Sequence, residues 1–127
     1  MSLITSISGI RGTIGGKPGE NFTPIDVVSF SSAYAAWLKD QNKKLGKTKL
    51  KIAIGRDARP SGLLVHNLVS SVMISMGIDV LDLGLSTTPT VEMMVVMKNC
   101  DGGIVITASH NPVEWNALKL LNVQGEF

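Results

Sequence analysis

The sequence predicts an α/β fold, a three-layer α/β/α domain built on a mixed, mostly parallel sheet. Short apolar segments typical of strands alternate along the chain with helical segments of roughly ten to twenty residues. Two Thr-Pro pairs stand where helices would begin, and glycines or prolines separate the segments. Neither an internal repeat nor a low-complexity stretch interrupts this alternation.

The first predicted elements are a strand, a glycine-rich turn and a long helix. Residues 3–7 are the strand candidate, and residues 9–16 are expected to form the turn. Thr23 can cap a helix whose first turn contains Pro24. Apolar residues then recur at helical spacing, which predicts a helix that ends near Lys43.

The middle of the chain repeats the alternation. Residues 50–54 are apolar enough for a strand, and a second helix should open at Pro60 or Ser61. Its apolar stripe has i, i+3 and i+4 spacing, and Gly77 is placed to end it in a left-handed cap. Residues 78–83 are the next strand candidate.

The last part of the chain contains the third helix and two more strands. Thr88 and Pro89 repeat the cap-and-proline opening of a helix that should run to about Lys98. Residues 103–107 are apolar on both sides, which predicts a central strand. The remaining segments are a loop at 108–116, a strand at 117–122 and a tight turn at 123–125.

The end of the sequence suggests a longer protein. Only Glu126 and Phe127 follow the last turn, so most of a returning strand would be missing. We therefore expect residues 1–127 to be one domain, with further domains of the same polypeptide absent from this chain.

Composition limits the classes of function. Apolar residues make up 44% and charged residues 17%, which is typical of soluble globular domains. A net charge of +2 is too small to indicate nucleic-acid binding, and no run approaches the roughly eighteen apolar residues of a membrane span. The single cysteine, Cys100, excludes an internal disulfide. We expect a cytoplasmic protein without nucleic-acid or membrane partners.

Two loops contain arginines at positions where α/β domains place their sites. Arg11 lies among glycines and could hold a phosphate with its forked guanidinium, or it could belong to an ordinary surface turn. That segment matches neither the dinucleotide fingerprint nor the P-loop. Arg56, Asp57 and Arg59 precede a helix N-terminus, where anions bind readily. They could contact substrate, or they could form a structural Arg–Asp network.

A third loop follows the apolar strand and reads Thr-Ala-Ser-His-Asn-Pro from Thr107 to Pro112. Ser109 beside His110 suggests acyl transfer, but adjacent side chains on extended backbone diverge and no G-x-S-x-G elbow is present. Taken alone, the loop could also be a plain turn.

Together these motifs resemble the α-D-phosphohexomutases, the family of phosphoglucomutase, phosphomannomutase and phosphoglucosamine mutase. The six-residue string that contains Ser109 is the specific element, because it resembles the family's phosphoserine loop. The matching segments, in order, are Gly9-Ile10-Arg11-Gly12, Gly55-Arg56-Asp57-Ala58-Arg59, Asp82-x-Gly84 leading to Thr88-Pro89, and Thr107 to Pro112 followed by Asn116 and Lys119.

The resemblance implies a role for each of five residues. Ser109 would carry the phosphate between turnovers, and a phosphate oxygen on it would be one ligand of Mg²⁺. Lys119 would be a general acid/base beside the reacting hydroxyl, and Arg11 would reach into the same site. His110 would join these three as a catalytic residue. The substrate-binding residues would be Arg11, His110, Asn111 and Lys119.

The implied activity interconverts hexose 1-phosphate and 6-phosphate through the phosphoserine and a bisphosphate intermediate. The added phosphate needs neutralising by cations, and backbone N–H groups of the loop could help. The family binds Mg²⁺ mainly through an Asp-x-Asp-x-Asp string in its second domain, and no two acidic residues here are two positions apart. The isolated chain should therefore be inactive.

Two questions stay open on the sequence alone. Trp115-Asn116-Ala117-Leu118 stands where many members read tyrosine, asparagine, glycine and an aromatic or apolar residue, so glucose, mannose and glucosamine phosphates are all candidate substrates. The alternatives to a mutase are a non-catalytic phosphate- or nucleotide-binding module that uses the Arg11 and Arg56 loops, and a structural domain.

Overall fold

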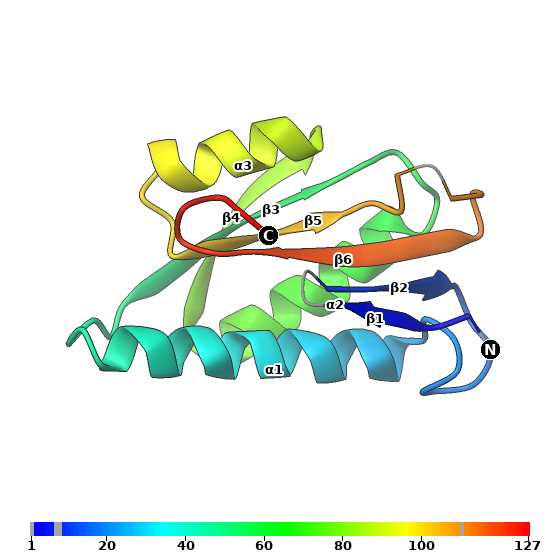
Figure 1. Ribbon diagram of the computed structural model, residues 1–127, viewed down its shortest axis with the longest axis horizontal. Coiled ribbons are helices and arrows are strands. Elements are labelled where there is room, and N and C mark those ends of the chain that lie inside the picture. The colour runs from blue at the N-terminus through cyan, green and yellow to red at the C-terminus, as the bar shows by residue number, and fades with distance from the viewer. Residues whose placement is uncertain (1, 7–8, 110) are drawn as a thin grey trace.

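A mixed sheet separates two helices on one face from a third helix on the other (Figure 1). This computed structural model describes residues 2–6, 9–109 and 111–127. The strand order across the sheet is β1-β2-β6-β5-β3-β4. The strands are β1 (Ile4–Ser6), β2 (Gly9–Thr13), β3 (Leu50–Arg56), β4 (Ile78–Leu85), β5 (Gly102–Ile106) and β6 (Trp115–Leu121), and the helices are α1 (Pro24–Lys43), α2 (Gly62–Ser75) and α3 (Thr88–Met97). The predicted three-layer α/β/α class is confirmed.

The expected predominance of parallel pairing is wrong. Within the described residues β3 pairs in parallel with β4 and β5, whereas the β1–β2, β2–β6 and β5–β6 pairs are antiparallel. A parallel return needs a crossover of a dozen or more residues, usually a helix. Only residues 7–8 separate β1 from β2, and only residues 107–114 separate β5 from β6, so both connections are too short for such a crossover and these strands return antiparallel.

The predicted turn over residues 9–16 is also partly wrong, because its first five residues form β2. A side-chain Cβ at Gly9 would lie 1.8 Å from the carbonyl oxygen of Leu118, so this glycine permits the close approach of β2 to β6. The turn follows the strand, at Gly15 and Gly16, which have φ angles of 86° and 81°.

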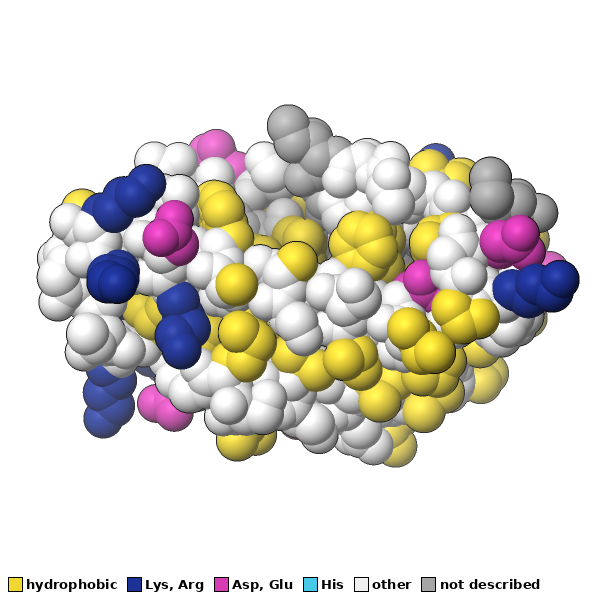
Figure 2. Space-filling model, turned by 90° about the horizontal axis from the view of Figure 1, so that it is seen from below, with side chains coloured by type: hydrophobic (Ala, Val, Ile, Leu, Met, Phe, Trp, Pro, Cys, Tyr) yellow, Lys and Arg dark blue, Asp and Glu magenta, His cyan; other side chains and the backbone are white. Residues whose placement is uncertain are grey.

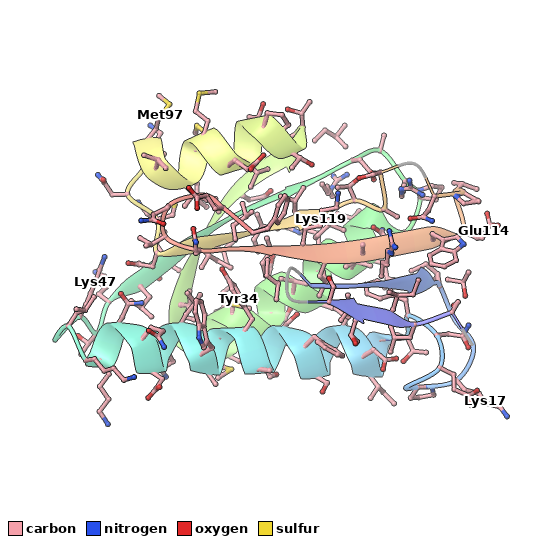
Figure 3. All side chains as sticks on the ribbon, in the orientation of Figure 1. Lys17, Tyr34, Lys47, Met97, Glu114 and Lys119 are labelled. Atoms are coloured by element: carbon pink, nitrogen blue, oxygen red, sulfur yellow. The ribbon has the colours of Figure 1, made fainter. Side chains whose placement is uncertain are left out.

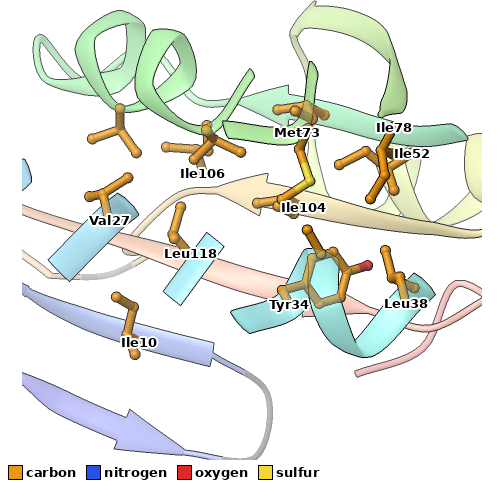
Figure 4. Packing of buried hydrophobic residues seen from close by; sticks show 14 of the residues in the cluster. Ile10, Val27, Tyr34, Leu38, Ile52, Met73, Ile78, Ile104, Ile106 and Leu118 are labelled. Carbon is orange, nitrogen blue, oxygen red and sulfur yellow. The ribbon is translucent and has the colours of Figure 1, made fainter. Parts of the chain in front are cut away.

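The predicted central strand is confirmed. All five residues of β5 are buried, and the strand lies between β6 and β3. Ile104 and Ile106 of β5 and Leu118 of β6 point toward α1 and α2, where they join one core cluster (Figure 4). Val105 lies on the opposite face, in the cluster beneath α3. Burial on both faces holds the carboxyl end of β5 in place.

Helix boundaries follow the predicted signals closely. Gly77 follows α2 with a φ of 79°, as expected for a left-handed cap. The cap of α3 is Thr87, one residue before the predicted Thr88, and its hydroxyl accepts the N–H of Thr90 at 3.2 Å. Pro89 therefore occupies the second helical position, where its missing N–H costs nothing.

The N-terminus of α1 is closed by a capping box formed by Thr23 and Asp26. The Thr23 hydroxyl accepts the N–H of Asp26, and the Asp26 carboxylate accepts the N–H and the hydroxyl of Thr23 at 3.1 Å and 2.5 Å. Thr23→Ala is expected to lower the free energy of unfolding of the 127-residue chain by about 1 kcal/mol. Urea unfolding followed by circular dichroism measures this, with the exposed Thr48→Ala as matched control; equal midpoints for the two variants would contradict the assignment.

The Thr23–Asp26 capping box also predicts that the stability of the fold depends on pH. Burial raises the pKa of Asp26, but hydrogen bonds from Thr23, Gly19 and its own backbone outweigh this and lower the pKa below its ordinary value of 3.8. Asp26 therefore stabilises the fold above that value, and its contribution is lost as the pH falls through the lower folded-state pKa. The stability difference between wild type and Asp26→Asn should shrink over that acidic range.

The α1 side of the molecule carries exposed apolar side chains (Figure 2). Ile25, Val28 and Trp37 of α1 are among them. No helix within the described part of the chain is long and apolar enough to cross a membrane. The cytoplasmic location stays a prediction.

Candidate active site

The candidate site lies where the carboxyl ends of β3 and β5 meet. The loop after β3 begins with Asp57, whose N–H donates to the carbonyl oxygen of Ile106 at the end of β5, at 3.1 Å. The loop after β5 contains Ser109 and leads into β6. Two of the three predicted loops are thus joined by a hydrogen bond at the carboxyl ends of these neighbouring strands.

Ser109 is exposed and has a φ of 52°, in the left-handed region. Few residues other than glycine adopt this conformation, and it persists where surrounding contacts hold it. Here the Ser109 N–H donates to the Thr107 hydroxyl at 3.1 Å, and that hydroxyl donates to Oδ2 of Asp57 at 2.6 Å. This chain of hydrogen bonds fixes the backbone at Ser109 and leaves its hydroxyl outside.

Lys119 contacts Ser109 directly. Its Nζ donates to Oγ of Ser109 at 2.5 Å, a short contact as expected for a charged donor. Lys119 lies in the middle of β6, where it pairs with Val105 and therefore shares the α3 face of the sheet (Figure 3). A rigid strand thus places an ammonium group at the serine oxygen.

Arg11 lies on the same face of the sheet. In the antiparallel register of β2 and β6, Gly9 is opposite Lys119 and Arg11 is opposite Ala117, which makes Arg11 a diagonal neighbour of Lys119. Arg11 is exposed, and its guanidinium has no hydrogen-bond partner among residues 2–6, 9–109 and 111–127. Both side chains line a hollow of about 220 Å³, completed by Ile4, Ser6, Gly9, Ile10, Ala117 and Leu118.

Arg59 has the opposite environment, because every N–H of its guanidinium is bonded. Nε donates to Asp57 at 3.0 Å. The two terminal nitrogens donate to four backbone carbonyl oxygens at 2.6–3.1 Å, those of Ser109, Asn111, Pro112 and Trp115. The side chain is 10% exposed. Arg59 and Asp57 therefore form a structural network, one of the two possibilities that the sequence left open.

The backbone of the loop is bonded inward. The Ser109 N–H already donates to Thr107, and the Asn111 N–H donates to the carbonyl oxygen of Ala108 at 3.0 Å. These two amides are therefore occupied within the loop, and help from its other N–H groups stays a prediction. His110 lies outside the described residues, so its expected catalytic role stays a prediction, as does substrate contact by the Asn111 side chain.

Comparison with known proteins assigns the chain to a family. A family model described as phosphoglucomutase/phosphomannomutase, alpha/beta/alpha domain I, matches residues 3–127. The chain belongs to this family. A phosphoglucomutase/phosphomannomutase of Thermococcus kodakarensis is 38% identical over 116 residues, which are 90% of this chain and 25% of that protein. A phosphoglucosamine mutase of Helicobacter pylori is 40% identical over 118 residues, 91% of this chain and 25% of the relative.

A solved structure shows the same fold. A putative phosphomannomutase from Thermus thermophilus superposes with a TM-score of 0.82 and 25% identity, over 98% of this chain and 27% of that one. The chain thus spans about a quarter of the length of the relatives and of the structure that it matches.

Thr107 and Asn116 are two supporting residues of this phosphoglucomutase/phosphomannomutase domain to which the sequence assigned no contact. Thr107 stands two residues before Ser109, a spacing at which a threonine hydroxyl commonly accepts a backbone N–H, and this signal could have been used. The Asn116 side chain is buried and donates to Ser61 at the start of α2, at 2.8 Å. No local pattern predicts that contact.

Proposed function

We propose that the parent polypeptide is a phosphohexomutase, an intramolecular phosphotransferase that interconverts hexose 1-phosphate and 6-phosphate, and that this chain contains its phosphate carrier, Ser109. The observation that carries the proposal is the 2.5 Å contact between Nζ of Lys119 and Oγ of Ser109, a serine that is exposed and yet held in a left-handed conformation. The proposal also agrees with the names of the relatives.

The site suits a nucleophile that gives and takes phosphate. In one direction a sugar hydroxyl attacks the phosphorus carried by Ser109, a bond to the sugar oxygen forms, and the bond to the serine oxygen breaks. The hydroxyl passes its proton to Lys119 in its amine form, and the ammonium so formed donates a proton to the departing serine oxygen. The bisphosphate then returns its other phosphate to Ser109 by the reverse step, which leaves the isomeric monophosphate.

The main requirement of this reaction is positive charge that neutralises the phosphate. A phosphoserine adds about −1.5 to −2 charges, and phosphoryl transfer is catalysed mostly by positioning and electrostatic stabilisation. Lys119 and Arg11 face the same hollow and supply two positive charges there. Arg59 contributes no free N–H, so we assign phosphate binding to Arg11 rather than to Arg59.

Mg²⁺ fits this site only in part. No group of three or more histidine, cysteine, aspartate or glutamate side chains that could hold a metal occurs in the described part of the chain. A phosphate oxygen on Ser109 would be the ligand that this chain offers, and the carboxylates would come from the rest of the polypeptide. When bound, Mg²⁺ would neutralise charge on the transferring phosphate.

The test uses the full-length protein with Mg²⁺ and the 1- and 6-phosphates of glucose, mannose and glucosamine. We expect turnover of at least one pair, and, after incubation with a sugar 1,6-bisphosphate, one stable phosphate that peptide mapping places on Ser109. The 127-residue chain is the control and should fold without turning over substrate. A stable phosphate on another residue, or turnover with none, would refute the proposal.

A further inference from the structure

The two arginines near Ser109 differ in how they are used. Arg11 is exposed and has no hydrogen-bond partner in the described residues, whereas Arg59 is almost buried and saturated. A guanidinium has five N–H donors, and all five of Arg59 are engaged, one by a carboxylate and four by carbonyl oxygens. A residue so bonded has none left for a ligand, so its effect must be on the loop itself.

The four carbonyl groups come from one segment, residues 109–115. Each carbonyl oxygen is the negative end of a peptide dipole. If these oxygens faced the serine hydroxyl, they would repel a phosphate dianion placed there. Because Arg59 donates to all four, its positive charge lies against their negative ends and offsets them beside Ser109.

The hydrogen bonds that Asp57 accepts also determine how the neighbouring groups are oriented. Oδ2 of Asp57 accepts both from Nε of Arg59 and from the Thr107 hydroxyl. Since the Thr107 proton is directed at Asp57, the hydroxyl oxygen presents a lone pair to the Ser109 N–H. The left-handed φ at Ser109 is therefore fixed from two ends, its N–H by Thr107 and its carbonyl oxygen by Arg59.

We propose that Arg59, Asp57 and Thr107 form a positioning unit that sets the loop in its phosphate-accepting geometry before phosphate or substrate arrives. The unit engages the four carbonyl oxygens and holds Oγ of Ser109 at Lys119. It does not contact the phosphate. This inference rests on the proposed function for its catalytic consequence, but the preformed geometry can be measured without activity.

Arg59→Lys in the full-length protein tests the unit. A lysine keeps the charge but offers three donors at one point, so it cannot reach carbonyl oxygens spread over residues 109–115. We expect kcat to fall roughly 10²-fold, as for a displaced reacting group, with little change in KM. Hydrogen exchange at the Ser109 amide should become faster, while the amides of β5 and β6 keep their protection.

A second pair of variants keeps the test valid if Arg59→Lys does not fold. Thr107→Val removes the hydroxyl and should reproduce both effects, whereas Thr107→Ser retains it and should restore wild-type kcat and exchange. Thr48→Val, on an exposed threonine far from the site, is the matched control. Unchanged exchange at Ser109 in Thr107→Val, equal losses in Thr107→Ser and Thr107→Val, or an effect of Arg59→Lys on KM alone would each overturn the proposal.

The exchange measurement separates this inference from the proposed function. If wild-type protein has no mutase activity and yet Ser109 loses protection in Arg59→Lys and Thr107→Val, the proposed function fails and the positioning unit stands. If wild-type protein is an active mutase and both variants match it in kcat and exchange, the proposed function stands and the positioning unit fails.

Discussion

Ser109→Ala in the full-length enzyme is expected to abolish phosphate uptake at this position and to lower kcat roughly 10⁴-fold or more, because the oxygen that carries the phosphate is gone. The nearby Thr107 hydroxyl cannot replace it, since its proton is directed at Asp57 and its lone pair at the Ser109 N–H. Intact mass after incubation with a sugar 1,6-bisphosphate, together with a coupled assay, measures both losses.

The substitution should leave the loop in place. Alanine loses only Oγ, whose contact is with Lys119. The hydrogen bonds of the residue 109 backbone to the side chains of Thr107 and Arg59 remain. Ser75→Ala, at the exposed last residue of α2, is the matched control and should behave as wild type. Normal turnover by Ser109→Ala in a preparation free of wild-type enzyme would show that the phosphate carrier lies elsewhere.

Lys119→Arg is expected to slow the chemical step by roughly 10²–10⁴-fold, the usual contribution of a general acid/base. The variant keeps the positive charge beside Ser109, but a guanidinium essentially cannot exchange a proton near neutral pH, whereas an ammonium can. The larger planar group must also fit where Nζ now lies 2.5 Å from Oγ. Single-turnover kinetics of pre-phosphorylated enzyme isolate this step.

Arg11→Lys should behave differently. Arg11 is free on the same face of the sheet, within the described residues, and can hold a phosphate with two parallel hydrogen bonds, which a lysine cannot form. We expect KM to rise more than kcat falls. Steady-state kinetics of both variants, at matched phosphoserine content, compare the roles. If Lys119→Arg retains near-normal kcat while Arg11→Lys abolishes it, the roles of the two residues are reversed.

The elements that local signals specify were predicted well. The Thr23 cap and the recurring apolar residues give α1 its bounds, and the apolar run gives β5 its central place. The errors concern β2 and the direction of strand pairing. The glycines of residues 9–16 suggest a turn in isolation. Position 9 needs a glycine for another reason: the backbone of Leu118, which is distant in sequence, lies too close for any side chain there.

The sequence by itself determined the family resemblance, the α/β class and the positions of Ser109 and Lys119, because a short string and a regular alternation are local properties. Only the tertiary structure decided which arginine is available to a phosphate. Arg11 and Arg59 are the same residue type in loop-like sequences, yet Arg59 is saturated by carbonyl groups that lie 50 and more positions further along the chain. Hydrogen-bond capacity depends on the partners that folding brings near, and local sequence does not contain them.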